Sequence, residues 1–227
     1  MNSIIEPGLV LYLPLSGLEG SALISRDARG HLGAVTGAAW CLGGRSFDNT
    51  DDRITVNPVV PCIKTNTAGT ILAWIYKQDT AVNEVLNIQD NDGAQYSALA
   101  FRINDDDKVR CLHYNNRNPM ITWDVKTVAT LVSNVWYMVG ITQDGVSPQL
   151  YVNGEAAAQN FVISTDKTKW LAGITGLDVA TIGAWIGSGV AATNFFNGKI
   201  GAVYYFSRAL TPAEVKHIYL ATKWRYR

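Results

Sequence analysis

The 227-residue sequence is poor in charge, since Asp, Glu, Lys and Arg make up only 17% of it, against about 25% in an average globular domain. Its 19 acidic and 19 basic residues cancel, so it lacks the net positive field that draws proteins to a nucleic-acid backbone. No apolar run approaches the roughly 18 residues that a membrane-spanning helix requires. These absences argue against a nucleic-acid partner and against membrane insertion.

The N-terminal segment lacks the features of a signal peptide. Its first 15 residues contain no Lys or Arg, and prolines and a glycine interrupt their apolar stretch. The whole sequence also lacks an Asn-x-Ser/Thr acceptor for N-glycosylation. From both features we expect that the chain is made and folds in a reducing cytoplasm.

Cysteine is scarce, and the three residues Cys41, Cys62 and Cys111 fit neither a disulfide framework nor a CxxC zinc site. We predict free thiols that are buried as small apolar side chains. Hydrophobic residues are abundant instead, at 48% of the chain with seven Trp. A chain of this length can bury one large core, so we expect a single domain over residues 1–227.

Short β-rich runs separated by turn residues extend over the whole chain, whereas helical periodicity is almost absent. This pattern predicts an all-β sandwich of two antiparallel sheets. Leu9, Leu11, Leu13 and Leu15 alternate with other residues, so all four should face the core. Residues 70–76 are nearly all apolar, which is typical of a central strand buried on both faces. Further strands are predicted at residues 84–89, 97–103, 108–114, 136–142, 149–152 and 198–206.

One helix is predicted near the end of the chain. Thr211 can cap it, Pro212 suits its first position, and Glu214 completes a capping box. We expect this helix to lie across an end of the sandwich, through the apolar stripe formed by Val215, Ile218 and Tyr219.

The last third of the chain holds more aromatic residues than one core needs, which suggests a subunit contact or a binding groove. Residues 221–227 are basic and aromatic; they either fray from the fold or dock on a neighbouring subunit. The aromatic residues concerned are Trp170, Trp185, Phe195, Phe196 and Trp224.

Six motifs follow one another in a characteristic order, at residues 8–15, 27–40, 44–54, 70–76, 136–154 and 196–219. The clearest are S-F-D-N-T-D-D-R-I at 46–54 and L-Y-V-N-G at 150–154. In this order they resemble the laminin-G-like branch of the concanavalin A-like lectin/glucanase superfamily. The resemblance implies a two-sheet jelly roll with a short C-terminal helix, and we expect Trp74 and Trp136 in its core. A fold by itself does not establish a function.

Calcium is the one cofactor that the sequence suggests. Family members that hold a structural calcium often carry an acidic residue in the final strand, where this chain has Gly201 and Ala202, so that site is expected to be lost. Acidic turns at residues 51–52, 90–92 and 105–107 are either solvated turns or oxygen ligands for Ca²⁺. If two loops meet, the ligands would be Asp90, Asp92, Asp105 and Asp107.

One stretch combines amides with aromatic rings, as sugar-binding sites require. Amides form directional hydrogen bonds with hydroxyl groups, and aromatic faces stack on the apolar C–H patches of a pyranose. The same residues are also ordinary in exposed loops. We predict a site for a glycan or cell-surface polysaccharide at His113, Tyr114, Asn115, Asn116, Arg117 and Trp123.

Catalytic signatures are missing. Glycoside hydrolysis on this fold needs two carboxylates at a defined separation, but the five glutamates are isolated from one another. The sequence motifs of jelly-roll polysaccharide lyases are also absent, although Arg102, His113 and Tyr114 are residue types that such lyases use in catalysis. We predict no catalytic residues and no enzymatic activity; the alternative is a glycoside hydrolase or lyase on the same fold.

Two functions agree with these observations. The first is a lectin-like module that acts in adhesion by binding glycans. The second is a structural or decoration module, whose partners would be further copies of itself or other virion subunits. A stand-alone module without an export signal resembles bacteriophage virion proteins, which fold in the host cytoplasm before they assemble into a particle.

Overall fold

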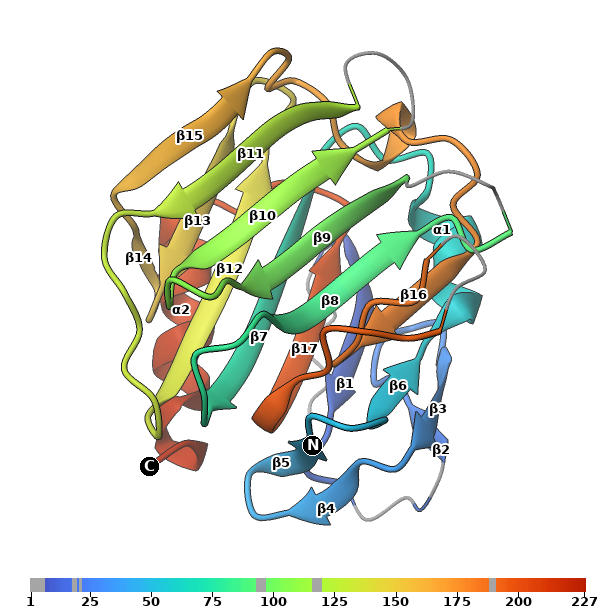
Figure 1. Cartoon of the computed structure of the whole chain (residues 1–227), viewed down its shortest axis with the longest axis vertical. Helices are drawn as coiled ribbons and strands as arrows, with labels where there is room; N and C mark the ends of the chain where they lie inside the picture. The colour runs from blue at the N-terminus through green and yellow to red at the C-terminus, as the bar shows by residue number, and fades with distance from the viewer. Residues whose placement is uncertain (1–6, 18–19, 21, 93–96, 116–119, 188–190) are drawn as a thin grey trace.

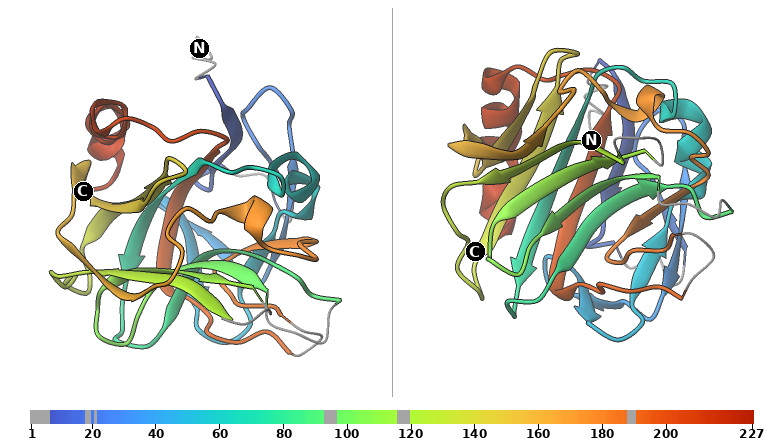
Figure 2. Two further views of the ribbon diagram at one scale, coloured as in Figure 1. Left: turned by 90° about the horizontal axis from the view of Figure 1, so that it is seen from above. Right: turned by 45° about the horizontal axis from the view of Figure 1, so that its top comes forward.

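The computed structural model describes residues 7–17, 20, 22–92, 97–115, 120–187 and 191–227. Two antiparallel β-sheets lie face to face, which confirms the predicted all-β sandwich with a C-terminal helix (Figure 1). Figure 2 shows the two layers from above, with helix α2 (Pro212–Thr222) outside one of them. A four-residue helix, α1 (Val60–Ile63), lies in a connection. Within the described part of the chain, no helix is long and apolar enough to span a bilayer.

The eight-stranded sheet is built around β7 (Gly69–Lys77), which pairs with β12 (Trp136–Gln143) on one side and β17 (Asn197–Phe206) on the other. All residues of β7 except Tyr76 are buried, which confirms the prediction of a central strand covered on both faces. The other strands are β1 (Leu9–Pro14), β4 (Ala39–Cys41), β5 (Gly44–Asp48), β13 (Pro148–Val152) and β14 (Glu155–Ala156).

The nine-stranded sheet faces the viewer in Figure 1, and its outer face carries the cleft described below. All its neighbouring strands are antiparallel. In spatial order they are β15 (Gln159–Ser164), β11 (Ile121–Thr127), β10 (Val109–Tyr114), β9 (Ala98–Ile103), β8 (Asn83–Gln89), β16 (Val179–Ile182), β6 (Arg53–Thr55), β3 (Leu32–Thr36) and β2 (Ala22–Ile24).

The opening strand β1 departs from simple alternation. Its register against β17 shifts between Leu9 and Leu11. Leu11 and Leu13, with Leu15 just beyond the strand, join the main core between the sheets, whereas Leu9 packs in a cluster on the opposite face. The prediction of four leucines on one face is therefore wrong at Leu9, because an irregular pairing changes the face to which a side chain points.

A second apolar cluster lies on the outer face of the eight-stranded sheet, under α2. Trp74 is buried there against Tyr219 of the helix, with ring centroids 5.7 Å apart, and Trp136 is half-buried nearby. The capping box of Thr211 and Glu214 is present as predicted. The helix covers a sheet face and not an end of the sandwich, because the outward apolar side chains of the sheet must also be removed from water.

The residues after α2 dock on their own chain. The Tyr226 ring stacks on Trp74 with centroids 4.2 Å apart, and its hydroxyl accepts a hydrogen bond from the Ala202 N–H at 3.0 Å. A Cβ at Gly201 would lie 2.4 Å from this ring, so the Tyr226 ring can pack here only because residue 201 is glycine. The prediction that residues 221–227 fray is wrong for Tyr226, although the side chain of Trp224 remains 59% exposed.

The three cysteines are free thiols, as predicted. Cys111 is buried, and burial raises the pKa of its thiol well above the usual range, which makes it unreactive. Cys41 and Cys62 are only half-buried, so the prediction of buried thiols is wrong for these two residues.

Candidate functional site

Two of the predicted ligand-binding residues, His113 and Trp123, face the core. They are cross-strand partners on β10 and β11, and both are 0% exposed. The His113 Nε2–H donates to the Trp170 carbonyl at 3.0 Å, and its Nδ1 accepts from the Thr122 hydroxyl at 2.6 Å. Trp123 donates to the Lys169 carbonyl at 2.9 Å. Neither ring can contact a ligand in this arrangement, so for these two residues burial corrects the prediction.

The other predicted residues divide between the surface and the undescribed part of the chain. Tyr114, one position after His113 on β10, points to the outer face of the sheet. Asn115 is tied to a neighbouring loop, since its amide donates to the Gly173 carbonyl at 2.7 Å and its Oδ1 accepts from Thr175 at 3.2 Å. Asn116 and Arg117 lie outside the described residues.

A cleft of about 360 Å³ opens on the outer face of the nine-stranded sheet. The Tyr114 and Trp185 rings meet edge to face in it, with centroids 6.0 Å apart. Such rings offer apolar surface, while amide, hydroxyl and guanidinium groups offer directional hydrogen bonds. The residues that line the cleft are Arg102, Tyr114, Met120, Trp185, Thr193 and Asn194.

Glu84 lies beneath this cleft and is completely buried. Its carboxylate accepts hydrogen bonds from Asn87 at 3.0 Å and from Arg102 and Asn194 at 3.4 Å each. Burial raises the pKa of Glu84, although the Arg102 charge acts in the opposite direction. No carboxylate lines the cleft among the described residues, so Glu84 has no partner at the mouth for a two-carboxylate hydrolysis.

The predicted calcium ligands do not come together as expected. Asp90 and Asp92 follow β8, and oxygens of both lie within 4.8 Å of one from Asp178, which the sequence did not suggest. Asp105 and Asp107 lie in the turn at the opposite end of β9. Asp107 instead binds the buried Lys77 ammonium at 2.6 Å. The prediction that both turns form one Ca²⁺ site is therefore wrong, because a six-residue strand separates the two turns by about 20 Å.

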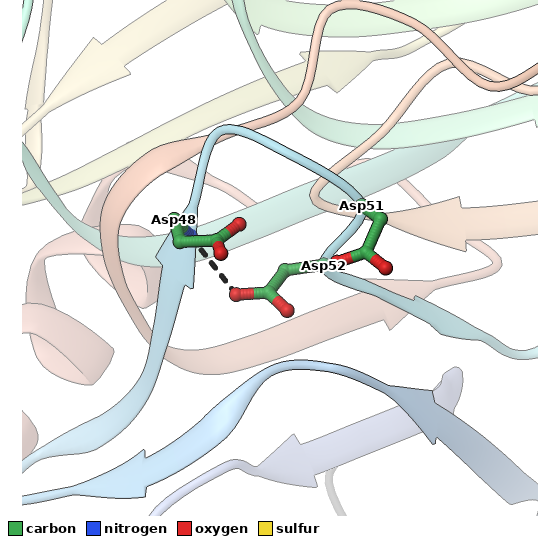
Figure 3. A group of neighbouring side chains, drawn as sticks. All are labelled: Asp48, Asp51 and Asp52. Atoms are coloured by element: carbon green, nitrogen blue, oxygen red, sulfur yellow. Dashed lines mark hydrogen bonds between the residues drawn. The ribbon is translucent and has the colours of Figure 1, made fainter.

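A second acidic group surrounds the turn after β5. Figure 3 shows Asp48, Asp51 and Asp52, whose carboxylate oxygens lie within 4.8 Å of one another. Asp52 accepts a hydrogen bond from the Asp48 N–H at 2.9 Å. Burial first, and then the charges of Asp48 and Asp51, raise the pKa of Asp52. Three hard oxygen ligands of this kind suit Ca²⁺.

Asp52→Asn should raise the melting temperature by a few degrees at about pH 7 in the presence of a chelator. A carboxyl whose pKa is raised in the folded state stabilises the protein only while protonated, and this stabilisation is lost as pH rises through its folded pKa. Asn keeps an acceptor for the Asp48 N–H but carries no charge. The exposed Asp51→Asn is the control, with a smaller expected change. A higher melting temperature for the wild type than for Asp52→Asn under these conditions would contradict the raised pKa of Asp52.

The comparisons with known proteins concern both family and fold. A family model described as "Concanavalin A-like lectin/glucanases superfamily" matches residues 48–216, which is most of the chain. No curated protein sequence matches.

Several solved structures are similar to this chain. The CBM40 module of the Ruminococcus gnavus IT-sialidase, bound to α2,3-sialyllactose, has a TM-score of 0.62 and 20% identity, over 71% of this chain and 86% of that one. The leech intramolecular trans-sialidase gives 0.64 and 19%, over 76% of this chain and 26% of that one. The binding domain of botulinum neurotoxin serotype C1 gives 0.65 and 13%, over 94% and 52%. At these identities the likeness establishes a shared fold.

Proposed function

The chain belongs to the concanavalin A-like lectin/glucanases superfamily, and from this we propose that it binds a glycan, without cleaving it, in the cleft on the outer face of its nine-stranded sheet. The observation that carries the proposal is the Tyr114 ring beside polar groups of Arg102 and Asn194 in one open cleft, which Trp185 borders. Aromatic surface beside fixed hydrogen-bonding groups is the chemistry that a pyranose needs.

Binding without catalysis agrees with the composition of the cleft. The described lining contains one guanidinium, one amide and two hydroxyl groups but no carboxylate. The sialidase CBM40 module of similar fold is bound to sialyllactose, which makes sialylated oligosaccharides sensible first probes.

Calorimetric titration with α2,3-sialyllactose, α2,6-sialyllactose and lactose tests the proposal. We expect saturable binding of at least one of them, and Tyr114→Ala should weaken it about tenfold, equivalent to about 1.4 kcal/mol. Trp224→Ala is the matched control, because this exposed ring lies by a different cleft, and its affinity should equal that of the wild type. Absence of binding to any oligosaccharide on a broader array, or unchanged affinity in Tyr114→Ala, would overturn the proposal.

A structural role in a virion or another surface particle is the second candidate function. It is favoured by the exposed apolar side chains of Trp40, Leu42 and Trp224, the last two of which border a cleft of about 240 Å³. Exposed patches of this kind often mediate contacts between proteins. Light scattering should then detect an oligomer that Leu42→Ser together with Trp224→Ala dissociates; a monomer at every concentration would argue against self-assembly.

A further inference from the structure

Three polar side chains lie side by side on the sheet face that carries the cleft. Thr181 of β16 is the cross-strand partner of Asn87 on β8. On the other side of β8, Asn87 and Gln89 are opposite Ala100 and Ala98 of β9. Residues directly opposite each other in antiparallel strands point to the same face. We call Asn87, Gln89 and Thr181 the polar row.

The polar row is buried, yet it is poorly satisfied. All three side chains are 0% exposed. Both amide atoms of Gln89, the Asn87 Oδ1 and the Thr181 Oγ1 have no hydrogen-bond partner among the described residues. Unpaired buried polar groups are rare in folded proteins because they destabilise them, and apolar residues of similar size would avoid this penalty. Four such atoms on two neighbouring strands are expected of a surface that serves to bind something else.

The row is adjacent to the cleft through Trp185. The indole forms one apolar cluster with Leu112 and with Ala98 and Ala100, the neighbours of the row, and it also lines the cleft. The connection that contains it starts directly over the row, since the Ala184 carbonyl accepts from the Asn87 amide at 3.1 Å.

We propose that the polar row is a second subsite, continuous with the cleft, which hydrogen-bonds the hydroxyl groups of a glycan when the Trp185 ring rotates off Ala98 and Ala100. This inference rests on the proposed glycan binding and adds how the sugar is held. The Gln89 amide can donate and accept, and the Thr181 hydroxyl can do both. The Asn87 Oδ1 accepts only, because its amide N–H groups already bond Glu84 and the Ala184 carbonyl. Together these groups suit adjacent hydroxyls of one sugar ring. The alanines give the space that the ring needs.

Trp185 then acts as an internal competitor for the subsite. Only molecules in which the indole has rotated away from Ala98 and Ala100 can bind a glycan at the subsite. The measured affinity for the glycan is therefore lower in proportion to the fraction of molecules in which the indole stays in place. Removing the indole should therefore strengthen binding, whereas a purely stacking role would predict the reverse.

The experiment measures affinity for the oligosaccharide that the wild type binds, by calorimetry, together with melting temperature. Trp185→Ala should bind about tenfold more tightly, and adding Gln89→Leu in that background should reverse the gain. Gln89→Leu and Thr181→Val in the otherwise unchanged chain should raise the melting temperature while lowering affinity. Gln78→Leu, at an exposed position, is the matched control and should change neither quantity.

The possible results separate this inference from the proposed function. One result would overturn the subsite but not the glycan site. In it, Tyr114→Ala and Trp185→Ala both weaken oligosaccharide binding, and Gln89→Leu leaves the affinity unchanged. Absence of oligosaccharide binding in every variant would overturn both. If Trp185→Ala fails to fold, the two single polar variants still decide: a higher melting temperature with unchanged affinity contradicts the subsite.

Discussion

Replacing Tyr226 by Ala should lower the free energy of unfolding by about 3–5 kcal/mol, the usual range for removing a large buried aromatic side chain. The ring is 9% exposed and packs on Trp74 and Trp136, with centroids 4.2 and 4.9 Å away. Removal of the ring exposes the backbone surface at Gly201 to water. It also deprives the Ala202 N–H of its acceptor, in a stretch where β17 shifts its register against β7 between Ile200 and Val203.

Tyr226→Phe separates the hydrogen bond from the packing. Phe keeps the ring but leaves the Ala202 N–H unpaired, which costs about 1–3 kcal/mol. Urea denaturation measures both variants, with Trp224→Ala as a control that removes an exposed ring from the same turn. Equal stability of wild type and Tyr226→Ala would show that the C-terminal turn is not anchored in solution.

Acidification from about pH 7 to about pH 4 should destabilise the chain by about 3 kcal/mol through His113 alone. Burial lowers the pKa of His113 from 6.5 to about 4, against the effect of its bond to the Trp170 carbonyl. Between these two values the unfolded chain binds a proton that the folded chain excludes. The stabilisation is therefore complete above pH 6.5 and is lost as pH falls through about 4.

The pH dependence is measured by urea denaturation of wild type and His113→Gln across that window. The variant is less stable at neutral pH, because Gln replaces a ring bonded at both nitrogens, but its stability should fall less steeply with pH. Acidic residues titrate in both proteins, so the difference between the two curves isolates His113. The control is His217→Gln on the exposed side of α2, whose curve should run parallel to that of the wild type. A parallel His113→Gln curve would contradict the prediction.

The strands could be predicted from the sequence because their signals are local. The residue range 198–206 and the observed strand Asn197–Phe206 differ by one residue, and the predicted capping box of Thr211 is present. The position of α2 could not be predicted from the sequence. A strand such as β7 is apolar on both faces, so its residues do not show which face is covered by the other sheet and which by a helix. The irregular pairing at Leu9 is also invisible, since it depends on a partner almost two hundred residues away.

The candidate site was predicted in part, and the errors have a definite cause. Tyr114, predicted to bind a ligand, lines the cleft, but His113 and Trp123 belong to the opposite face of the same sheet. Alternation counted from the buried Val109 and Cys111 would have assigned His113 to the inside. Apart from Met120, just before β11, the remaining lining comes from β9 and from the connection before β17, which only the folded chain brings beside Tyr114. These residues are Arg102, Trp185, Thr193 and Asn194.

The position of β17 has a consequence for how this protein reaches its native state in the cell. Although last in sequence among the strands, it stands inside its sheet, with β7 on one side and β5 and β1 on the other. A nascent chain still on the ribosome exposes those three strands as unpaired edges until residue 206 has left the exit tunnel. Completion of the sheet is thus a late, non-local and comparatively slow event, and open strand edges favour aggregation during this interval.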